Sequence, residues 1–590
     1  MPSGRAGKMP AGRKGETPSP RKSHKRGPMH EITRAWRKLL LVALVATAAT
    51  ANLRAGDWPM WGRTPQRNLS SDEKGLPSSF DLGPGKKLPG GEYDPASARN
   101  LKWSAKLGMI TCGSPVISGG KVFIGTNNGT PRDAKYQGDY GILMCLEESS
   151  GRFLWMLPVP AFARSGAISV LYPNLGICST PAVEGDKLFV VTSRCEVVCL
   201  DANGLGNGNR GPFRDESSYF ARPASESLAP GVVREGTSYR MRPGEPLLEV
   251  RRAKHGVTLG PADADVIWHY DMMSDLSVWP HDAAASSVLV YEDLLFVCTG
   301  NGTDNTHRNI PSPAGAALVA INKRTGAVVA VDDAEISRRA LEGSWSSPVL
   351  AKVGGRALVV IGGPDGVCYA FDASPAKSQA GKPGKLQKVW WFDCNPPGAR
   401  FKDRAHVKYP SPAGPSEIIA TPVFYKDRIY VAIGQDTRHG VAPGMLCCID
   451  ANGAGDITDS GRVWQYDRIG RSLSTVSIAD GLLYVADAGG AIHCLDAETG
   501  KAKWVMETGT LTCGSTLVAD GKVYVGTDKG ELLILSAGPE LKVLDKVNLH
   551  APIHTTPAAA NGVLYVATDT HLFAFEEKGQ RAGANAPASR

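Results

Sequence analysis

Residue patterns that commonly carry catalysis or bind metal ions are sparse in this chain of 590 residues. It contains no C-x-x-C, C-x-x-C-H or H-E-x-x-H motif, so neither zinc nor covalently attached haem has a recognisable ligand set. His550 and His554 stand in a strand or loop context, where their spacing gives no shared helical face. Residues 201–209 contain the oxygen-bearing side chains of a calcium loop, but they lack its fifth and twelfth ligands and favour a Gly- and Asn-rich turn. We therefore expect no metal site.

The 12 cysteines allow two interpretations. An even number permits a disulfide framework. Seven of them, however, lie two residues before the acid of a turn or before a Ser or Thr that begins a strand: Cys145, Cys199, Cys448, Cys494, Cys112, Cys178 and Cys513. Other repeats place Ala at the position before the acid, as at Ala320. We therefore expect these seven to fill small buried strand positions, where free cysteine packs as an apolar residue.

The most distinctive polar cluster of the sequence lies between residues 279 and 313. Trp279–Asp282 precede a predicted strand, and Thr299–His307 and Asn309–Pro313 follow it. Further Gly- and Ser-rich segments occur at the corresponding places of later repeats, at residues 343–348, 362–366, 434–436 and 471–475. No G-x-S-x-G nucleophile motif is present among them. These residues alone indicate no particular reaction.

The elements that must position these residues are strands joined by tight turns. Residues 482–486 and 492–495 are β-branched and aromatic runs on either side of Gly489-Gly490. Asp496 and Thr499 can bond the amides of the following turn, and Gly500 supplies its positive φ. Trp504 then offers a large flat side chain to a neighbouring sheet. The unit is therefore strand, turn, strand, turn and a Trp-bearing strand.

This unit recurs along the chain. Glu147, Gly151 and Trp155 keep the same offsets of four and eight residues. Small residues begin a strand upstream of each unit, at Ser114-Pro115, Thr180-Pro181, Ser286-Ser287, Ser347-Pro348, Thr421-Pro422, Thr475-Val476, Ser515-Thr516 and Thr556-Pro557. The last three positions are 40 and 41 residues apart. A period of about 40–45 residues is typical of propeller blades, so the chain is predicted to form eight four-stranded blades.

The motif D-x-x-T-G-x-x-x-W, complete at Asp496–Trp504, resembles the pyrroloquinoline-quinone (PQQ) type β-propeller repeat. That superfamily includes quinoprotein alcohol dehydrogenases and BamB-like outer-membrane assembly factors. Asp57–Arg63 looks like the D-W-P-x-[YW]-G-R opening of quinoproteins. The resemblance implies an all-β, eight-bladed propeller of antiparallel blades over residues 100–577, after a lead-in segment at 52–99. We expect the strand containing Trp103 to complete the last blade and close the ring.

Blade two is predicted to carry the largest insertion, at residues 205–265, which is rich in Gly, Pro and charge. A loop of this length inside a compact fold is usually functional or disordered. Its sequence does not decide between these two alternatives.

Resemblance to the quinoprotein enzymes would imply a PQQ and Ca²⁺ site in the central channel. Trp345 could then pack against the quinone, and Asn301 and Arg471 could supply polar contacts. Asp304 and Asp365 are the candidate bases, and Cys447-Cys448 could form the strained disulfide ring of methanol dehydrogenases. The alternatives are blade packing for Trp345, turn capping for Asp304 and Asp365, a surface or inter-blade donor role for Arg471, and packing into two blades for the cysteine pair. The metal-ligand and base positions of the enzymes are not matched residue by residue.

The two ends of the chain differ in composition from the repeats. Residues 1–28 are basic and rich in Pro, Gly and Ser, and they are predicted to be disordered, as are residues 578–590. Residues 29–51 combine Arg34, Arg37 and Lys38 with an apolar run and a small-residue cleavage site. This pattern predicts a secretory signal peptide, so we expect an exported protein of the periplasm or the extracellular space, without a transmembrane anchor after cleavage.

The basic charge resides in the leader. Residues 1–51 hold 11 of the 66 basic and 2 of the 58 acidic residues, which leaves 55 basic and 56 acidic residues in the remainder. The near-neutral remainder gives no argument for nucleic-acid binding.

Two functional hypotheses follow. The first is a secreted, monomeric, non-catalytic propeller that presents loops to a protein, cell-wall or carbohydrate partner. The second is a quinoprotein dehydrogenase that uses PQQ and Ca²⁺ to oxidise an alcohol or a sugar. We favour the first, because the motif that sets the fold is present while the site pattern of the enzymes is not.

Overall fold

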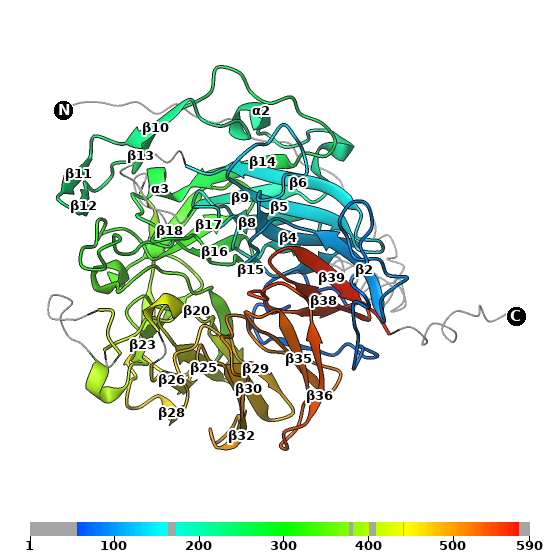
Figure 1. Ribbon diagram of the computed structural model, residues 1–590. Helices are drawn as coiled ribbons and strands as arrows, with labels where there is room; N and C mark the ends of the chain where they lie inside the picture. Colours follow the sequence, from blue (N-terminus) through cyan, green and yellow to red (C-terminus); the bar gives the residue numbers. More distant parts are fainter. Residues whose placement is uncertain are drawn as a thin grey trace, which may run out of the picture. The chain divides into compact units, whose positions relative to one another are not determined.

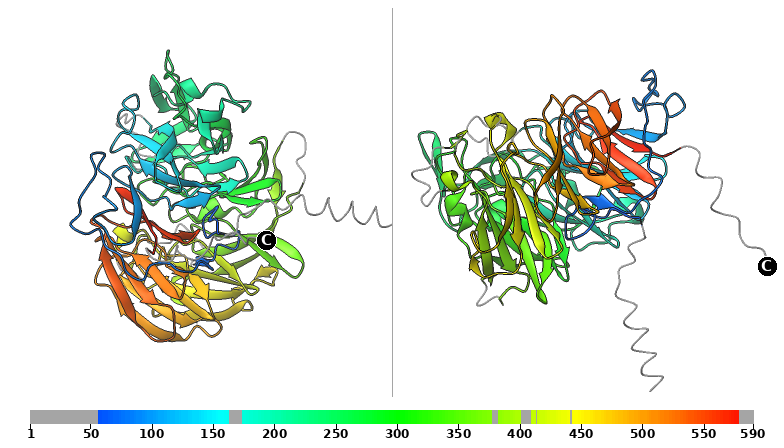
Figure 2. Two further views of the ribbon diagram at one scale, coloured as in Figure 1. Left: turned by 90° about the vertical axis from the view of Figure 1, so that its right-hand side faces the viewer. Right: turned by 90° about the horizontal axis from the view of Figure 1, so that it is seen from below.

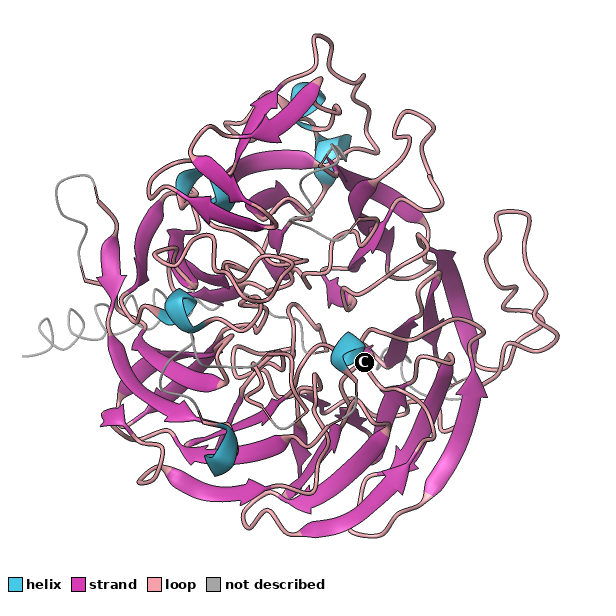
Figure 3. Ribbon diagram, turned by 60° about the vertical axis from the view of Figure 1, so that its left-hand side comes forward, coloured by secondary structure: helices cyan, strands magenta, loops and turns pink. Residues whose placement is uncertain are grey.

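The computed structural model describes residues 56–162, 173–376, 382–400, 409–412, 414–440 and 442–577. The predicted basic extension, signal peptide and C-terminal tail at residues 1–28, 29–51 and 578–590 lie outside the described residues. Nearly all regular structure is β-strand, and the helices are single turns within loops (Figure 1, Figure 3). These are η1 (Gly204–Asn207), α2 (Glu216–Tyr219), α3 (Met272–Asp275), η2 (Ile336–Arg339), η3 (Pro397–Ala399) and η5 (Thr437–His439). Among the described residues, no helix has the length and apolar character needed to cross a membrane.

The predicted eight blades are confirmed, and blades one to seven take their four main strands in chain order from the inside outward. Blade one contains β3 (Val116–Ser118), β4 (Lys121–Asn127), β5 (Tyr140–Glu147) and β6 (Phe153–Pro160). Blade two contains β7 (Ala182–Glu184), β8 (Lys187–Val191), β9 (Glu196–Asp201) and β14 (Asp265–Asp271). Blade three contains β15 (Leu289–Tyr291), β16 (Leu294–Cys298), β17 (Leu318–Asn322), β18 (Val328–Asp332) and the added β22 (Gly384–Leu386). Blade four contains β19 (Val349–Val353), β20 (Arg356–Gly362), β21 (Val367–Asp372), β23 (Lys388–Asp393) and the added β27 (Gly455–Asp456).

The second half of the chain forms the remaining blades. Blade five contains β24 (Val423–Tyr425), β25 (Arg428–Ile433), β26 (Met445–Asp450) and β28 (Arg462–Tyr466). Blade six contains β29 (Ser477–Ala479), β30 (Leu482–Ala486), β31 (Ala491–Asp496) and β32 (Ala502–Glu507). Blade seven contains β33 (Leu517–Ala519), β34 (Lys522–Gly526), β35 (Glu531–Ser536) and β36 (Val543–Asn548). The innermost hairpins turn at pairs of left-handed residues such as Asp480-Gly481 and Asn561-Gly562, which is the chemistry of a type I′ turn.

The eighth blade closes the ring. It joins β37 (Ala558–Ala560), β38 (Val563–Ala567) and β39 (His571–Phe575) to β2 (Leu101–Lys106) from the N-terminal side of the chain. β2 runs antiparallel to β39, with Trp103 opposite Ala574. Figure 1 shows the two strands side by side. The predicted closure by an N-terminal strand is therefore correct.

Tryptophans of the outer strands join neighbouring blades. Trp155 Nε1 donates a hydrogen bond of 3.2 Å to Ala202 O, in the turn of the next blade, and Trp504 Nε1 donates one of 3.1 Å to Gly538 O. Trp103 does the same to Glu148 O at 2.9 Å, and its ring covers Gly151, where an added Cβ would lie 2.5 Å from a ring carbon. The turn glycine therefore has two functions: it adopts positive φ and makes room for the Trp of the preceding blade.

The first part of the lead-in segment crosses the innermost strands of the ring. We call residues 57–71 the axial segment. Its backbone carbonyls accept hydrogen bonds from Val183 in blade two, Leu350 in blade four, Phe424 in blade five and Val518 in blade seven. Further contacts reach the other blades, at Ile117, Val288, Ile478 and Ala559. Its last two residues form β1 (Ser70–Ser71), which pairs in parallel with β33. The sequence predicted a segment here but not this path.

The long insertion lies between β9 and β14. It contains two small antiparallel sheets, one of β10 (Ser225–Leu228) with β13 (Leu248–Arg251) and one of β11 (Val232–Glu235) with β12 (Ser238–Met241). Figure 2 shows these strands projecting beyond the blades. The tip returns to blade three, because Met241 N donates to Pro311 O at 2.8 Å and Tyr239 N donates to Asp304 Oδ2 at 3.1 Å. The insertion thus supports the loop that follows β16.

Candidate functional site

Loops of blades three, four and five bring titratable side chains together where the ring carries its longest inner loops. We call the following set the histidine cluster: His281, His307, Glu342, Tyr409, Glu417 and His439. His281 precedes blade three, and His307 follows its second strand, β16. Glu342 precedes blade four, and Glu417 precedes blade five. His439 ends η5, in the loop between β25 and β26.

Two imidazoles meet edge to edge in this cluster. The Nε2 atoms of His281 and His307 are 3.2 Å apart. His281 Nδ1 lies 2.8 Å from the carbonyl oxygen of Thr303, which can only accept a hydrogen bond, so Nδ1 carries the proton. His281 Nε2 consequently keeps its lone pair and faces His307. His307 has a positive φ of 55°, a conformation found mainly where surrounding structure imposes it, often at functional sites.

Carboxylates complete the cluster. Glu342 Oε1 lies 3.5 Å from His307 Nε2 and 3.3 Å from His439 Nδ1. Glu417 accepts a hydrogen bond of 2.8 Å from the Tyr409 hydroxyl and another from Asp436 N. Glu342 is 1% exposed and Glu417 is fully buried. Two acids are therefore held together away from water, which is costly for their charged forms.

Burial sets the electrostatics of the site. It raises the pKa of Glu342 well above its usual range, with the Glu417 carboxylate adding to the effect, and it also raises the pKa of Glu417. Burial also lowers the pKa of His307 to about 4, assisted by the two neighbouring histidines. The pKa values of His281 and His439 are lowered for the same reason. Near pH 7 the imidazoles are neutral and present lone pairs.

The nitrogen and oxygen atoms of His281, His307 and Glu342 all lie within 4.8 Å of one another, which is close enough to hold one metal ion. Sequence reasoning predicted no metal site and missed this group. Its members are 26 and 35 residues apart, so no short motif reports them. The available signal was indirect: two of the three lie in the polar segments at 279–282 and 299–307.

Of the residues predicted from the resemblance, Trp345 lies at the histidine cluster. Its ring centroid is 5.7 Å from that of His281, and its Nε1 donates to His281 O at 2.9 Å. Arg471 is 1% exposed, so it is no surface residue, and it donates to Ser411 O at 2.5 Å. Burial lowers the Arg471 pKa, and Glu417 and Tyr409 oppose that effect. Trp345 and Arg471 thus flank the cluster from different blades.

Asn301 and Asp304 hold loops in place. Asn301 Oδ1 accepts from Trp279 N at 2.8 Å, and its Nδ2 donates to Ser312 O at 2.9 Å and to Ser337 Oγ at 2.8 Å. Asp304 Oδ1 accepts from Thr306 N, and its Oδ2 accepts from the insertion. Both side chains are fully buried, and their oxygen and nitrogen atoms already form hydrogen bonds with other residues of the chain.

Asp365 lies outside the cluster. Its Oδ2 accepts from the Tyr369 hydroxyl at 2.5 Å and pairs with Arg339 Nε at 2.9 Å. Its Oδ1 accepts from Val367 N in the turn that it caps. The carboxylate is thus engaged by an ion pair and a turn together.

The adjacent cysteines of β26 face two different cores. Cys447 packs between blades four and five, and Cys448 packs between blades five and six. Both are fully buried and free, so they form no disulfide ring. All 12 cysteines are described and all are free. Four of the seven predicted strand positions are buried, but Cys112, Cys178 and Cys513 are half-buried and lie outside strands, which corrects that expectation.

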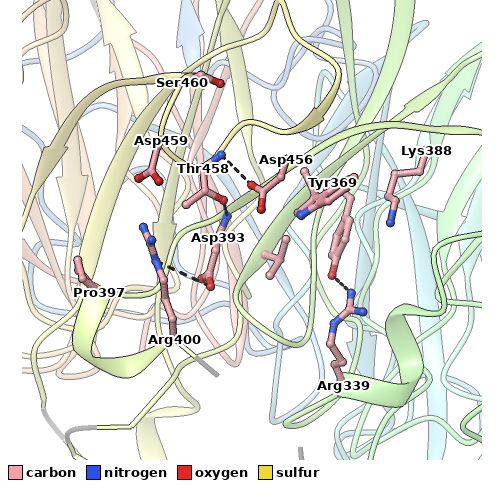
Figure 4. A pocket seen from close by; sticks show the side chains of 12 residues that line it. Arg339, Tyr369, Lys388, Asp393, Pro397, Arg400, Asp456, Thr458, Asp459 and Ser460 are labelled. Carbon is pink, nitrogen blue, oxygen red and sulfur yellow. Dashed lines mark hydrogen bonds and ion pairs between the residues drawn. The ribbon is translucent and has the colours of Figure 1, made fainter. Parts of the chain in front are cut away.

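A pocket of about 890 Å³ lies at the outer edge of blade four (Figure 4). Trp391 and Tyr369 contribute aromatic walls, and Lys388 Nζ lies 4.3 Å above the Trp391 ring. Asp393 and Asp456 add carboxylates, and further charged groups come from Arg339, Arg400 and Asp459. β27, which pairs in parallel with β23, brings Asp456 to this pocket from blade five. The volume lies within the range of small-molecule sites, about 300–1,000 Å³.

Comparison with known proteins agrees with the architecture. A family model described as outer membrane protein assembly factor BamB matches residues 453–543. BamB of Burkholderia pseudomallei (strain K96243) is 36% identical over 107 residues, which cover 18% of this chain and 27% of that protein. The chain carries PQQ-like β-propeller repeats.

A second relative of this PQQ-like propeller is an enzyme. Quinohemoprotein alcohol dehydrogenase ADH IIB of Pseudomonas putida is 22% identical over 474 residues, which cover 66% of this chain and 64% of that protein. The chain therefore spans less than two thirds of either relative. Among solved structures, BamB from Moraxella catarrhalis aligns with a TM-score of 0.44 and 14% identity over 80% of this chain and 98% of that one.

Proposed function

We propose that this PQQ-like propeller is an exported, non-catalytic protein of the cell envelope that binds a carbohydrate ligand from the cell wall. The pocket at the edge of blade four is the observation that carries this proposal. Trp391 can offer a ring face to a sugar once the Lys388 ammonium moves from that face, while Asp393 and Asp456 can accept, and Arg339 can donate, hydrogen bonds to hydroxyl groups. Such a mixture of aromatic and polar groups suits a polar ligand better than an apolar one. Export rests on the sequence of residues 29–51.

The alternative as a PQQ-dependent dehydrogenase receives less support. The residues expected to hold the quinone do not fit that group: Asn301 is saturated by its own loop, and Cys447 and Cys448 point into separate cores. The relative named as a quinohemoprotein also carries haem, whereas this sequence has no C-x-x-C-H motif. We therefore derive no oxidation step.

Calorimetric titration with soluble cell-wall glycan fragments and with neutral oligosaccharides tests the proposal. We expect wild-type protein to bind at least one of these, and Trp391→Leu or Asp456→Asn to weaken binding by ten-fold or more, because each removes a wall of the pocket. Tyr291→Leu is the matched control, since this aromatic side chain also lies beneath a lysine, with Lys352 Nζ 5.3 Å from its ring, but is outside the pocket.

Two results would overturn the proposed function. One is the absence of glycan binding by the wild-type protein, or equal binding by the Trp391→Leu variant. The other is substrate-dependent dye reduction with a quinone absorbance after incubation with PQQ and Ca²⁺. Circular dichroism of each variant verifies that its fold is retained.

A further inference from the structure

We propose that His281, His307 and Glu342 form a binding site for one divalent first-row transition metal ion, with zinc as the reference ion. This site is separate from the pocket at blade four and independent of the proposed glycan binding. Three observations carry the proposal: the spacing of the ligand atoms, the fixed tautomer of His281, and the burial of the Glu342 carboxyl group beside the two histidines.

The spacing agrees with tetrahedral coordination. Ligand atoms that lie 2.0–2.1 Å from a tetrahedral zinc ion are roughly 3.3 Å from one another. The two histidine Nε2 atoms are 3.2 Å apart, and Glu342 Oε1 is 3.5 Å from His307 Nε2. All three ligand atoms lie within 4.8 Å of one another, so an ion can occupy the space between the side chains once they close around it.

The His281 ring is held in the orientation of a ligand. Its Nδ1–H donates to Thr303 O at 2.8 Å, so the lone pair of Nε2 points at the site. A hydrogen bond from the remote ring nitrogen to a carbonyl is the usual support of a metal-binding histidine. Without a metal, His307 Nε2–H can donate to His281 Nε2, and a metal ion replaces that proton when His307 adopts the other tautomer. His281 is 2% exposed, so its ring is already shielded from solvent without any change in the fold.

Glu342 supplies a buried carboxyl group that lies within hydrogen-bonding reach of Glu417 and Tyr409. Its Oε1 is close to His307 and His439. Glu417, fully buried, lies next to it in the cluster and receives the Tyr409 hydroxyl. A divalent cation bound to Glu342 would supply the charge partner that a buried carboxylate needs. His439 Nδ1 would then hold the liganding oxygen as an outer-sphere donor.

The donor set selects the class of metal. Two imidazoles and one carboxylate suit zinc and its first-row neighbours, whereas calcium and magnesium require oxygen ligands. The side chains of His307 and His439 are 23% and 13% exposed, so the site opens toward solvent on their side. Three protein ligands and an open side leave a coordination position for water or for a ligand.

The test is zinc binding by the purified full chain, prepared without a polyhistidine tag and stripped with a chelator. We expect about one equivalent of Zn²⁺ by equilibrium dialysis with elemental analysis, and no competition by excess Ca²⁺. Glu342→Gln and His307→Asn should weaken zinc binding by 100-fold or more. Asn is chosen at position 307 because it tolerates the positive φ of that residue better than most side chains.

The matched control is His554→Gln. His554 is also a partly exposed histidine beside a carboxylate, with its Nδ1 3.0 Å from Asp569 Oδ1, but it lies outside the cluster. Its variant should bind zinc as wild type does. Visible absorption of the Co²⁺-loaded wild-type protein should show the intense bands of four- or five-coordinate cobalt, and Zn²⁺ should raise the unfolding temperature of wild type but not of His307→Asn.

A wild-type protein that binds no zinc, or a folded His307→Asn variant that binds it as tightly as wild type, would contradict the site. Displacement of zinc by calcium would contradict the assigned metal class. The outcome is separable from that of glycan binding, since Trp391→Leu should leave the zinc affinity unchanged and His307→Asn should leave glycan binding unchanged.

Discussion

One position in the third strand of several blades holds a small residue, because a tryptophan of the neighbouring outer strand faces it. Cys494 lies directly opposite Trp504, and Cys145 lies opposite Trp155. Where the third strand has Ala instead, at Ala370 and Ala574, the facing residue is again Trp. The repeat thus pairs a small residue with a large ring, and cysteine serves there by size rather than by redox chemistry.

This pairing predicts how Cys494 tolerates substitution. Cys494 is fully buried and Trp504 is 8% exposed, so a larger side chain at position 494 has no free space. We expect Cys494→Leu to lower the free energy of unfolding by about 1–3 kcal/mol through overpacking. Cys494→Ala should change it by less than about 1 kcal/mol. Urea denaturation of both variants measures the difference, and equal losses would show that size is not the constraint.

The sequence predicted these individual packing residues but not the histidine cluster, and the reason is physical. Asp496, Gly500 and Trp504 act within one repeat, so their spacing recurs and can be read. His281 and Glu342 act across two blades, and their proximity depends on the curvature of the ring. No local sequence pattern therefore encodes the proximity of these two side chains. Arg471 was a candidate channel contact, with a surface or inter-blade donor role as the alternative; it is buried and donates to Ser411 O beside the cluster.

At the scale of elements, the axial segment makes contacts that the chain can form with almost any residues. Many of its bonds to the blades use main-chain carbonyls, as at Pro59, Pro65 and Leu69, and no repeated side-chain pattern announces these. The strands of the blades, by contrast, were predictable from β-branched runs and turn residues. Side chains of the axial segment also bond the blades, among them Asn68, Ser71 and the fully buried Arg67.

Arg67 gives the prediction at this scale. Its guanidinium donates to Trp61 O at 2.7 Å, to Val288 O at 2.9 Å and to Pro348 O at 3.0 Å, while burial lowers its pKa to about 9. Arg67→Ala leaves three carbonyls without a donor, at about 1–3 kcal/mol each. We therefore expect a loss of about 3 kcal/mol or more in the free energy of unfolding.

The control for Arg67→Ala is Arg63→Ala. Both positions have a positive φ, of 62° and 64°, so the backbone strain of alanine is shared. Arg63 instead pairs at 3.5 Å with a fully exposed Asp72, and solvent screens such a pair so that it adds little to stability. Chemical denaturation should separate the two variants clearly. Similar losses for both would mean that the buried donor contributes little.

At the scale of the whole molecule, eight blades share their interfaces in a closed ring, so the loss of one interface weakens all of them. Trp103, 4% exposed, packs blade eight against blade one. We expect Trp103→Ala to cost about 3–5 kcal/mol and to shift one single unfolding transition to lower temperature. Differential scanning calorimetry measures this. A separate early transition, with the main one unmoved, would show that blade eight unfolds on its own.

The path of the axial segment has a consequence for biosynthesis. Residues 57–71 leave the ribosome near the beginning of translation, yet their contacts extend to Val518 and Ala559, close to the end of the message. A nascent chain that has produced five or six blades still lacks the last partners of the axial segment and the strand β39 with which β2 pairs. The ring therefore cannot close until synthesis is almost over, and the unfinished blades expose apolar surface to which chaperones can bind in the meantime.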